Sequence, residues 1–281
     1  MDGKIMLQDI LGLSMEKTKK FNLHLAAKSN GVEPLDVFAT NREEWREWNE
    51  YRDGKNVWTR DYIFTLIPDY HKQNRYVFGG VYQIIERFEN WQENLRGYHV
   101  ELDEMYNSFI GRLYVEFYRY PGLRGRNYLF EKFIESMCVA EITEMPYSGE
   151  PFPGFDNVNI SFSSLEIIYS HHKQDWYTAL ENVKGVYLIT DSNNGKKYVG
   201  SAYGDNGIWS RWADYAFSGT GGNDELVKII EKNGLDYARK YFKFSILELF
   251  SMKTDNDFII TRECFWKSVL LTRGEFGYNK N

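Results

Sequence analysis

The chain has 281 residues, a formal net charge of −6 and two cysteines, Cys138 and Cys264. It contains no apolar run of the roughly 18 residues that a spanning helix needs and no secretory signal at its start. Its two distant cysteines indicate neither a disulfide framework nor a zinc site. We therefore expect a cytoplasmic protein with one large domain or two ordinary ones.

The negative charge is concentrated in the first two thirds of the chain. Residues 181–281 contain 14 basic and 13 acidic residues, and residues 1–180 contain the remaining 20 basic and 27 acidic residues. A net negative charge argues against general adhesion to nucleic acid, but the C-terminal third repels phosphate least. The composition therefore permits a phosphate-binding surface in that third.

Residues 1–53 show helical periodicity. Leu7, Ile10, Leu11 and Met15 recur at helical spacing, and aromatic residues recur three or four positions apart between 41 and 51. This pattern predicts amphipathic helices that cover a core.

Residues 57–117 are rich in aromatic and β-branched residues, which favours strands at 62–67, 76–85, 98–102 and 110–117. Gly79 and Gly80 lie inside one of these segments and indicate a bulge or a bend. A curved antiparallel sheet with flanking helices suits a small barrel of about five or six strands. This pattern resembles the PUA-type barrels, a superfamily whose members often read bases in nucleic acid.

Three further segments lead to the second part of the chain. Residues 130–138 show helical spacing, 139–142 suit a short strand, and the loop 147–157 is rich in proline and glycine. Short helices are expected at 164–171 and 176–180. We place the domain boundary between about 150 and 180, and predict an N-terminal domain of residues 1–165 and a C-terminal domain of residues 166–281.

Residues 185–200 predict a β-hairpin, because two runs of β-forming residues flank a dense turn signal. A two-residue turn at Asn194 and Gly195 would pair Tyr187 with Ala202 and Tyr198 with Asp191. Tyr187 and Tyr198 would then lie on one face, and a register slip of one residue would separate them. The alternative is an ordinary hairpin with two tyrosines in the core.

Two helices and a third strand follow the hairpin. The first helix begins near Ile208 and places Arg211 and Tyr215 together at a spacing of four, with Ile208 and Trp212 facing inward. Arg211 suits a phosphate, and a surface arginine is the alternative. Residues 242–250 alternate as a third strand of a small antiparallel sheet.

The last predicted helix, at 257–273, carries one carboxylate on an apolar stripe: Ile259, Glu263, Trp266 and Leu270 lie on one face. An unpaired buried carboxylate costs several kcal/mol, so Glu263 needs a cation or hydrogen-bond donors beside it. Mg²⁺ would satisfy it, and a salt bridge to an arginine or lysine is the alternative.

These segments together resemble the GIY-YIG nuclease domain in order and spacing. The matching pieces, over about residues 183–281, are Gly185-Val186-Tyr187, Tyr198-Val199-Gly200, Arg211, the run from Arg262 to Lys267, and the run from Phe276 to Asn279. The resemblance implies a three-stranded antiparallel sheet flanked by helices, and hydrolysis of DNA phosphodiester bonds with one Mg²⁺ or Mn²⁺ ion per site.

The resemblance also implies the role of each matching residue. Tyr187 and Tyr198 match the two motif tyrosines, Arg211 the catalytic arginine, Glu263 the metal-binding glutamate and Asn279 an active-site asparagine. Tyr215 stands where several members of the family have a histidine, so its part in proton transfer is open. Glu248 is a competing carboxylate whose position does not match the metal ligand.

For the mechanism, we expect Tyr187 to be the general base, with its pKa lowered from about 10 by a neighbouring cation. Tyr198 would orient the water or the phosphate, and Arg211 would hold the phosphate oxygens. The sequence does not decide which tyrosine takes the proton.

The larger N-terminal domain is expected to recognise double-stranded DNA, so that the protein acts as a restriction endonuclease, as a homodimer on DNA. It would read a flipped or modified base. The alternatives are a repair or mobile-element nuclease and a DNA-binding protein that does not cleave. The aromatic candidates for base recognition, for which core packing is the alternative, are Trp58, Tyr62, Phe78, Tyr82 and Tyr98.

Overall fold

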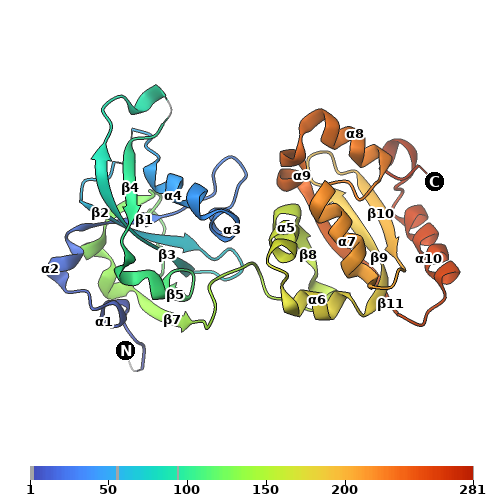
Figure 1. Cartoon of the computed structure of the whole chain (residues 1–281), viewed down its shortest axis with the longest axis horizontal. Coiled ribbons are helices and arrows are strands. Elements are labelled where there is room, and N and C mark those ends of the chain that lie inside the picture. Colours follow the sequence, from blue (N-terminus) through green and yellow to red (C-terminus); the bar gives the residue numbers. More distant parts are fainter. Residues whose placement is uncertain (1–2, 55–56, 94, 281) are drawn as a thin grey trace. The chain divides into compact units, whose positions relative to one another are not determined.

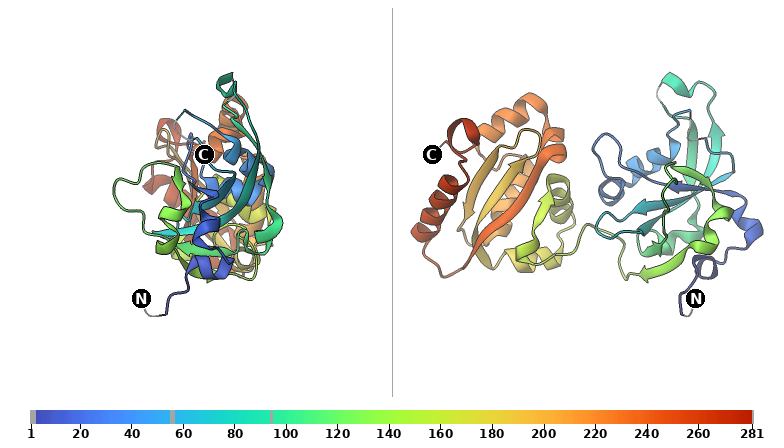
Figure 2. Two further views of the ribbon diagram at one scale, coloured as in Figure 1. Left: turned by 90° about the vertical axis from the view of Figure 1, so that its left-hand side faces the viewer. Right: turned by 180° about the vertical axis from the view of Figure 1, so that it is seen from behind.

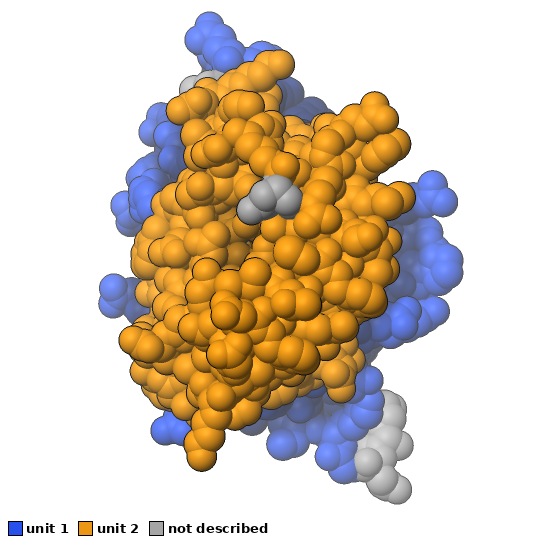
Figure 3. All heavy atoms as spheres, turned by 90° about the vertical axis from the view of Figure 1, so that its right-hand side faces the viewer, with its two compact units in different colours: residues 1–147 blue, residues 148–281 orange. Residues whose placement is uncertain are grey.

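The structure is a computed structural model that describes residues 3–54, 57–93 and 95–280. The chain divides into two compact units, residues 1–147 and residues 148–281, which Figure 3 colours blue and orange. Each unit has its own hydrophobic core. Among the described residues, no helix is both long enough and apolar enough to cross a membrane.

The division between the units lies before the predicted one. A boundary between 165 and 166 would cut helix α5 (Phe162–Ser170), whose residues Phe162, Leu165 and Ile168 are buried in the core of the second unit. Strand β8 (Asn159–Ser161) also pairs into the sheet of that unit. Burial of these side chains keeps both elements with the second unit.

The first unit is built on a seven-stranded mixed sheet (Figure 1). Its strands pair in the order β6-β1-β2-β3-β5-β7, and β4 also pairs with β3. The strands are β1 (Phe21–Leu25), β2 (Tyr62–Pro68), β3 (Arg75–Arg87), β4 (Tyr98–Leu102), β5 (Leu113–Glu116), β6 (Asn127–Leu129) and β7 (Cys138–Ile142). The strands expected at 62–67, 76–85 and 98–102 are confirmed.

Two expectations that concern the sheet of the first unit were wrong. The segment 1–53 is not all helical, because β1 lies within it and pairs in parallel with β2, in the interior of the sheet. No closed barrel forms from the described residues, since β6 and β7 end the path of paired strands and do not pair with each other. A barrel requires that the last strand close on the first.

The helices of this unit are short. They are α1 (Leu7–Leu11), α2 (Met15–Thr18), α3 (Pro34–Thr40) and α4 (Arg42–Glu50), with 3₁₀ turns η1 (Trp91–Glu93), η2 (Glu104–Phe109), η3 (Phe130–Lys132) and η4 (Ile134–Ser136). The helix expected at 130–138 is replaced by η3 and η4. Asn41 begins α4, because its side chain accepts hydrogen bonds from the amides of Glu43 and Glu44, each at 3.1 Å.

The bulge expected at Gly79 and Gly80 is confirmed. Thr65 pairs with Gly80 and Leu66 with Phe78, so Gly79 is the extra residue. A Cβ atom at 79 would lie 2.7 Å from Trp45 Cζ2, and Trp45 Nε1 donates to the carbonyl of Gly79 at 3.0 Å. The glycine therefore lets α4 pack directly on the sheet.

The second unit contains a four-stranded antiparallel sheet in the order β10-β9-β11-β8, one strand more than predicted. The further strands are β9 (Val183–Asp191), β10 (Lys197–Ala202) and β11 (Phe242–Ser251). The helices and turns are α6 (Gln174–Leu180), α7 (Gly207–Ser218), α8 (Asp224–Asn233), α9 (Leu235–Tyr241), α10 (Asn256–Val269), η5 (Phe155–Asn157) and η6 (Gly274–Phe276).

Helices α7 and α10 cover opposite faces of this sheet (Figures 1 and 2). Tyr187 and Ile189 of β9 pack with α7 in the larger core of the unit. Val186, which alternates with them, packs with Ile259 of α10 in a smaller cluster. The edge strand β10 contributes side chains to both faces of the sheet.

Candidate active site

The hairpin of β9 and β10 brings Tyr187 and Tyr198 to one face of the sheet. Tyr187 pairs with Gly200, and Tyr198 pairs with Ile189. The predicted pairs were wrong by two residues, because Asp191 and Lys196 close a four-residue turn in which Gly195 has φ +77°. An even shift leaves every side chain on its predicted face, so the tyrosines still share one.

Gly200 makes room for the ring of Tyr187. A Cβ atom at position 200 would lie 2.5 Å from Tyr187 Cζ, inside van der Waals contact. The phenol therefore lies across the backbone of β10 and is fully buried.

Helix α7 supplies an arginine and a second buried phenol. Arg211 Nε donates to the hydroxyl of Tyr187 at 3.1 Å, and another guanidinium nitrogen donates to the hydroxyl of Tyr215 at 3.2 Å. The two hydroxyls are 3.0 Å apart and hydrogen-bonded. Ile208 and Trp212 are fully buried, so the predicted inner stripe of this helix is confirmed.

Burial controls the protonation of this cluster. It raises the pKa of Tyr187 above its ordinary value of 10.0, as does Tyr198, and Arg211 opposes this only in part. Arg211 lowers the pKa of Tyr187 as expected, but burial outweighs it, so the expectation of a net lowered pKa was wrong. Burial also raises the pKa of Tyr215. Burial disfavours the charge of Arg211, but Tyr187 and Tyr215 outweigh this and raise its pKa, so Arg211 is charged.

Tyr198 and one end of Arg211 remain accessible. Tyr198 is half-buried, and its ring centre lies 6.5 Å from that of Tyr215. The remaining guanidinium nitrogen of Arg211 contacts Asp214 at 3.1 Å, and the Asp214 side chain is 61% exposed. An exposed ion pair of this kind contributes little, about 0–1 kcal/mol, so an anion can replace Asp214.

Glu263 lies on the other face of the sheet. Its carboxylate accepts a short hydrogen bond from Ser201 of β10 and lies 2.6 Å from Lys267 Nζ. The prediction that Glu263 has a cation or hydrogen-bond donors beside it is confirmed. Lys267 forms the salt bridge that was the alternative to a metal, and Ser201 donates a hydrogen bond. Ser201 and Lys267 were not among the predicted site residues, although Ser201 alternates with Gly200 and Lys267 follows Glu263 by four.

A metal at Glu263 would depend on ligands from outside the chain. Within the ranges described, no three His, Cys, Asp or Glu side chains converge on a possible metal position. Mg²⁺ is commonly held by one or two carboxylates together with water and substrate phosphate. Glu263 fits that arrangement as a single carboxylate ligand, in competition with Lys267.

Asn279 closes part of the edge of β10. Its side-chain oxygen accepts from the amide of Val199 at 2.9 Å, and its amide nitrogen donates to the carbonyl of Val199 at 2.8 Å. The amide of Tyr278 also donates to the carbonyl of Lys197. Backbone groups alternate along a strand, so the amide and carbonyl of Ser201 point to this same edge, beyond Asn279.

Glu248, the competing carboxylate, has its own partners. It accepts from Arg262 Nε at 2.9 Å and from Trp266 Nε1 at 2.8 Å. Both of these partners lie on α10, the helix that also carries Glu263.

The structure brings together two of the aromatic candidates of the first unit, Trp58 and Tyr98. Trp58 lines a cavity, its amide donates to the hydroxyl of Tyr98 at 2.9 Å, and the two ring centres are 6.4 Å apart. Phe78 and Tyr82 are buried, and Tyr62 packs on Phe21. Other residues that line this cavity were not among the predicted site residues: His24 of β1, and Trp48 and Tyr51 from the region of α4.

Comparison with known proteins gave limited matches. No family model matches this chain, and no curated protein matches it. Among solved structures, the catalytic domain of the homing endonuclease I-TevI is similar, with 32% sequence identity and a TM-score of 0.27 over 35% of this chain and 98% of that one. A mutant of the I-TevI catalytic domain gives 30% identity and a TM-score of 0.27 over 35% and 94%.

Proposed function

We propose that this chain is a metal-dependent endonuclease of the GIY-YIG type that hydrolyses phosphodiester bonds in double-stranded DNA. The observation that carries the proposal is the charged arginine fixed by two buried phenols beside the half-buried Tyr198. Two of the nitrogens of Arg211 bind Tyr187 and Tyr215, and the third contacts only an exposed aspartate among its hydrogen-bond partners in the described residues. Such an arginine is oriented in advance for an anion that arrives from solvent.

A phosphate oxygen would replace Asp214 on Arg211. The planar guanidinium suits phosphate, and its position fixed by Tyr187 and Tyr215 limits the reorganisation needed when charge develops in the reaction. Tyr187 acts as a neutral phenol that holds Arg211, since burial raises its pKa. Tyr198, which reaches solvent, orients the attacking water.

The substrate would lie across the edge of β10, because Arg211 and Glu263 flank this strand from opposite faces. When bound at Glu263, a Mg²⁺ or Mn²⁺ ion supplies positive charge that stabilises the leaving oxygen. Ser201 orients the carboxylate of Glu263 through its hydrogen bond. Asn279 holds the edge strand in place and ends the open part of the edge.

Lysines near this edge can bind the phosphates of the DNA. Lys196, Lys228, Lys232 and Lys280 line a cavity of about 620 Å³ that Asn279 also borders. The ion pairs of Lys228 with Glu225 and of Lys280 with Asp224 are exposed, so phosphates can replace those partners. Contacts of this kind release counterions and make binding depend on salt.

We further propose that the first unit recognises DNA and that the protein is a restriction enzyme directed against foreign DNA. The first unit has a core of its own and is larger than the second, so it can act as a separate recognition module. Because each chain has one active site, cleavage of both strands requires two chains, and we propose a homodimer on DNA.

Plasmid cleavage with Mg²⁺ or Mn²⁺ tests the function, using unmodified and cytosine-modified DNA. We expect cleavage of at least one plasmid by the wild type, a loss of about a hundredfold or more in Arg211→Ala, and loss of cleavage in Glu263→Gln. The matched control is Arg239→Ala, because Arg239 also binds carboxylates, Glu166 and Asp236, but on α9. It should cleave as the wild type does.

Two outcomes would contradict these proposals. Failure of the wild type to cleave either plasmid with either metal would exclude the nuclease. Cleavage only of branched or damaged DNA would exclude the restriction role and leave a repair or mobile-element nuclease.

A further inference from the structure

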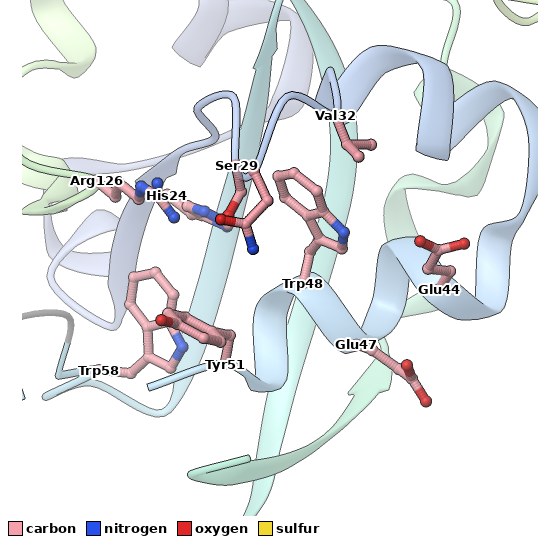
Figure 4. A pocket seen from close by; sticks show the side chains of 10 residues that line it. His24, Ser29, Val32, Glu44, Glu47, Trp48, Tyr51, Trp58 and Arg126 are labelled. Atoms are coloured by element: carbon pink, nitrogen blue, oxygen red, sulfur yellow. The ribbon is translucent and has the colours of Figure 1, made fainter. Parts of the chain in front are cut away.

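The first unit contains a cavity of about 320 Å³ with aromatic walls. Figure 4 shows Trp48, Tyr51 and Trp58 bordering the same space, with His24 and Arg126 side by side at one end. Cavities that bind small ligands begin at about this volume and combine apolar walls with a few polar groups. The active site proposed above, on the second unit, does not use this cavity.

Hydrogen bonds hold Trp58 in place, and ring packing supports Trp48. Trp58 Nε1 donates to the carbonyl of Asn49 at 2.9 Å, and the amide of Trp58 donates to the hydroxyl of Tyr98 at 2.9 Å. Trp48 stands on α4 and packs on the buried Trp45, with ring centres 6.3 Å apart. Rings fixed in this way lose little conformational freedom when they bind a ligand.

The tautomer of His24 follows from its neighbours. The side-chain nitrogen of Asn49 donates to the carbonyl of Trp45 at 3.1 Å, so its oxygen faces His24 Nδ1, which is 2.9 Å away. His24 Nδ1 therefore carries the proton, and Nε2 is an acceptor. Burial lowers the pKa of His24 from 6.5 to about 4, so the ring is neutral near pH 7.

The polar groups of the cavity supply both donors and an acceptor. Arg126 lies near enough to His24 to lower its pKa, and it contributes a cation with fixed donors. A cation in the wall does not suit a cationic ligand such as an alkylated amine. Two carboxylates, Glu44 and Glu47, also line the cavity, and both residues are exposed. Glu47 is paired with Arg96 at 2.5 Å and points away from the rings. The cavity therefore suits a flat, uncharged ring with acceptor and donor groups on its edge.

We propose that this cavity binds a single nucleobase extruded from a DNA duplex. The choice of DNA rests on the proposed function, since a nuclease presents DNA to its recognition unit. Every base has faces that stack on tryptophan or tyrosine, and an edge that combines donors with acceptors. An extruded base placed against Trp48, Tyr51 and Trp58 stacks on these rings and meets His24 and Arg126 at its edge.

Direct binding to three kinds of DNA probe tests the proposal. The probes share one sequence and are fully paired, or carry one unpaired base, or carry an abasic site at the unpaired position. The unpaired base is in turn adenine, cytosine, guanine, thymine or 5-methylcytosine. Affinities are measured by fluorescence anisotropy on the full chain, with EDTA present so that no cleavage occurs. An unpaired base costs less to extrude than a paired one.

We expect at least one unpaired base to bind about tenfold more tightly than the abasic probe, which is within the range for stacking of one base. Trp48→Ala and Tyr51→Ala should each reduce this ratio toward one. Tyr118→Ala is the matched control, because Tyr118 is an aromatic residue of the same unit, 63% exposed and outside the cavity lining. It should keep the ratio.

Equal binding of all five bases and the abasic probe would overturn the proposal, as would a ratio that survives both substitutions in the cavity. The outcome is separate from that of the cleavage assay. A chain that cleaves plasmid without distinguishing base from abasic site retains the proposed function and loses this cavity site. A chain that distinguishes a base from an abasic site without cleaving plasmid retains the cavity site and loses the proposed nuclease function.

Discussion

The hydroxyl of Tyr187 accepts from Arg211 Nε and is hydrogen-bonded to Tyr215 in a region closed to solvent. Removing it would leave the ring packing in place and release one side of the guanidinium. A misplaced group in a preorganised site costs far more in rate than in stability, because the reaction depends on alignment. Tyr187→Phe can separate these two effects.

For Tyr187→Phe we expect cleavage to fall by about a hundredfold and the free energy of unfolding to fall by about 1 kcal/mol. Cleavage rates and urea unfolding measure the two quantities. The control is Tyr169→Phe, which also removes a buried phenol hydroxyl, one that donates to the carbonyl of Trp209 at 2.6 Å. It should lose similar stability and keep its activity; equal losses of activity in both variants would contradict the role of Tyr187.

His24 gives a prediction about pH. Because its folded-state pKa is lowered from 6.5 to about 4, the unfolded state takes up a proton in this interval that the folded state excludes. The His24 contribution to stability is present above pH 6.5 and is lost as pH falls toward 4, by up to about 3 kcal/mol. Burial raises the pKa of Asp36 from 3.8 to about 6, which acts in the opposite direction.

The variant His24→Gln isolates the histidine from Asp36. We expect this variant to lose less stability than the wild type when the pH is lowered from 7 to 4.5, as measured by urea unfolding. Parallel curves of stability against pH for the two proteins would show that His24 titrates alike in both states.

Among the elements, the hairpin of β9 and β10 sets the position of the cluster through one close approach. Gly200 faces Tyr187 across the pair, and the phenol occupies the space where a side chain at position 200 would lie. The neighbouring edge of β10 is held by Asn279 at Val199. The strand therefore positions residues on both faces of the sheet.

Gly200→Ala should displace the ring of Tyr187, destabilise the unit by about 1–3 kcal/mol and reduce cleavage. The melting temperature and the cleavage rate test this. Gly204→Ala is the control, because no atom lies within 4 Å of a Cβ built at Gly204. Equal melting temperatures of the two variants would show that the close approach of Tyr187 to Gly200 does not determine the stability of the unit.

At the scale of the whole molecule, the two separate cores predict two units that fold independently. The fragment 148–281 contains β8 and all of α5, whereas the fragment 166–281, cut at the predicted boundary, lacks β8 and the first half of α5. Loss of the buried Phe162, Leu165 and Ile160 exposes the core of the second unit.

We expect 148–281 to fold cooperatively and 166–281 to be unfolded or much less stable, as measured by calorimetry and circular dichroism. The full chain should unfold in two thermal transitions, one of which matches the transition of the fragment 148–281. Cooperative folding of both fragments with equal stability would support the predicted boundary between residues 165 and 166.

The sequence by itself determined the local geometry of the second unit. Alternation along a strand placed Tyr187 and Tyr198 on one face even though the turn was mistaken, because the error was an even number of residues. Helical periodicity placed Arg211 beside Tyr215 and turned Trp212 inward. These relations depend on spacing within one element or one hairpin, which the sequence records directly.

Only the tertiary structure decided which segments meet and how deeply they are buried. It placed β1 inside the large sheet, put Glu263 on the face opposite Arg211, and raised rather than lowered the pKa of Tyr187. It also assembled the cavity of His24, Trp48 and Trp58 from separate segments. Strand order and desolvation arise from contacts between residues far apart in the chain, for which local periodicity holds no information.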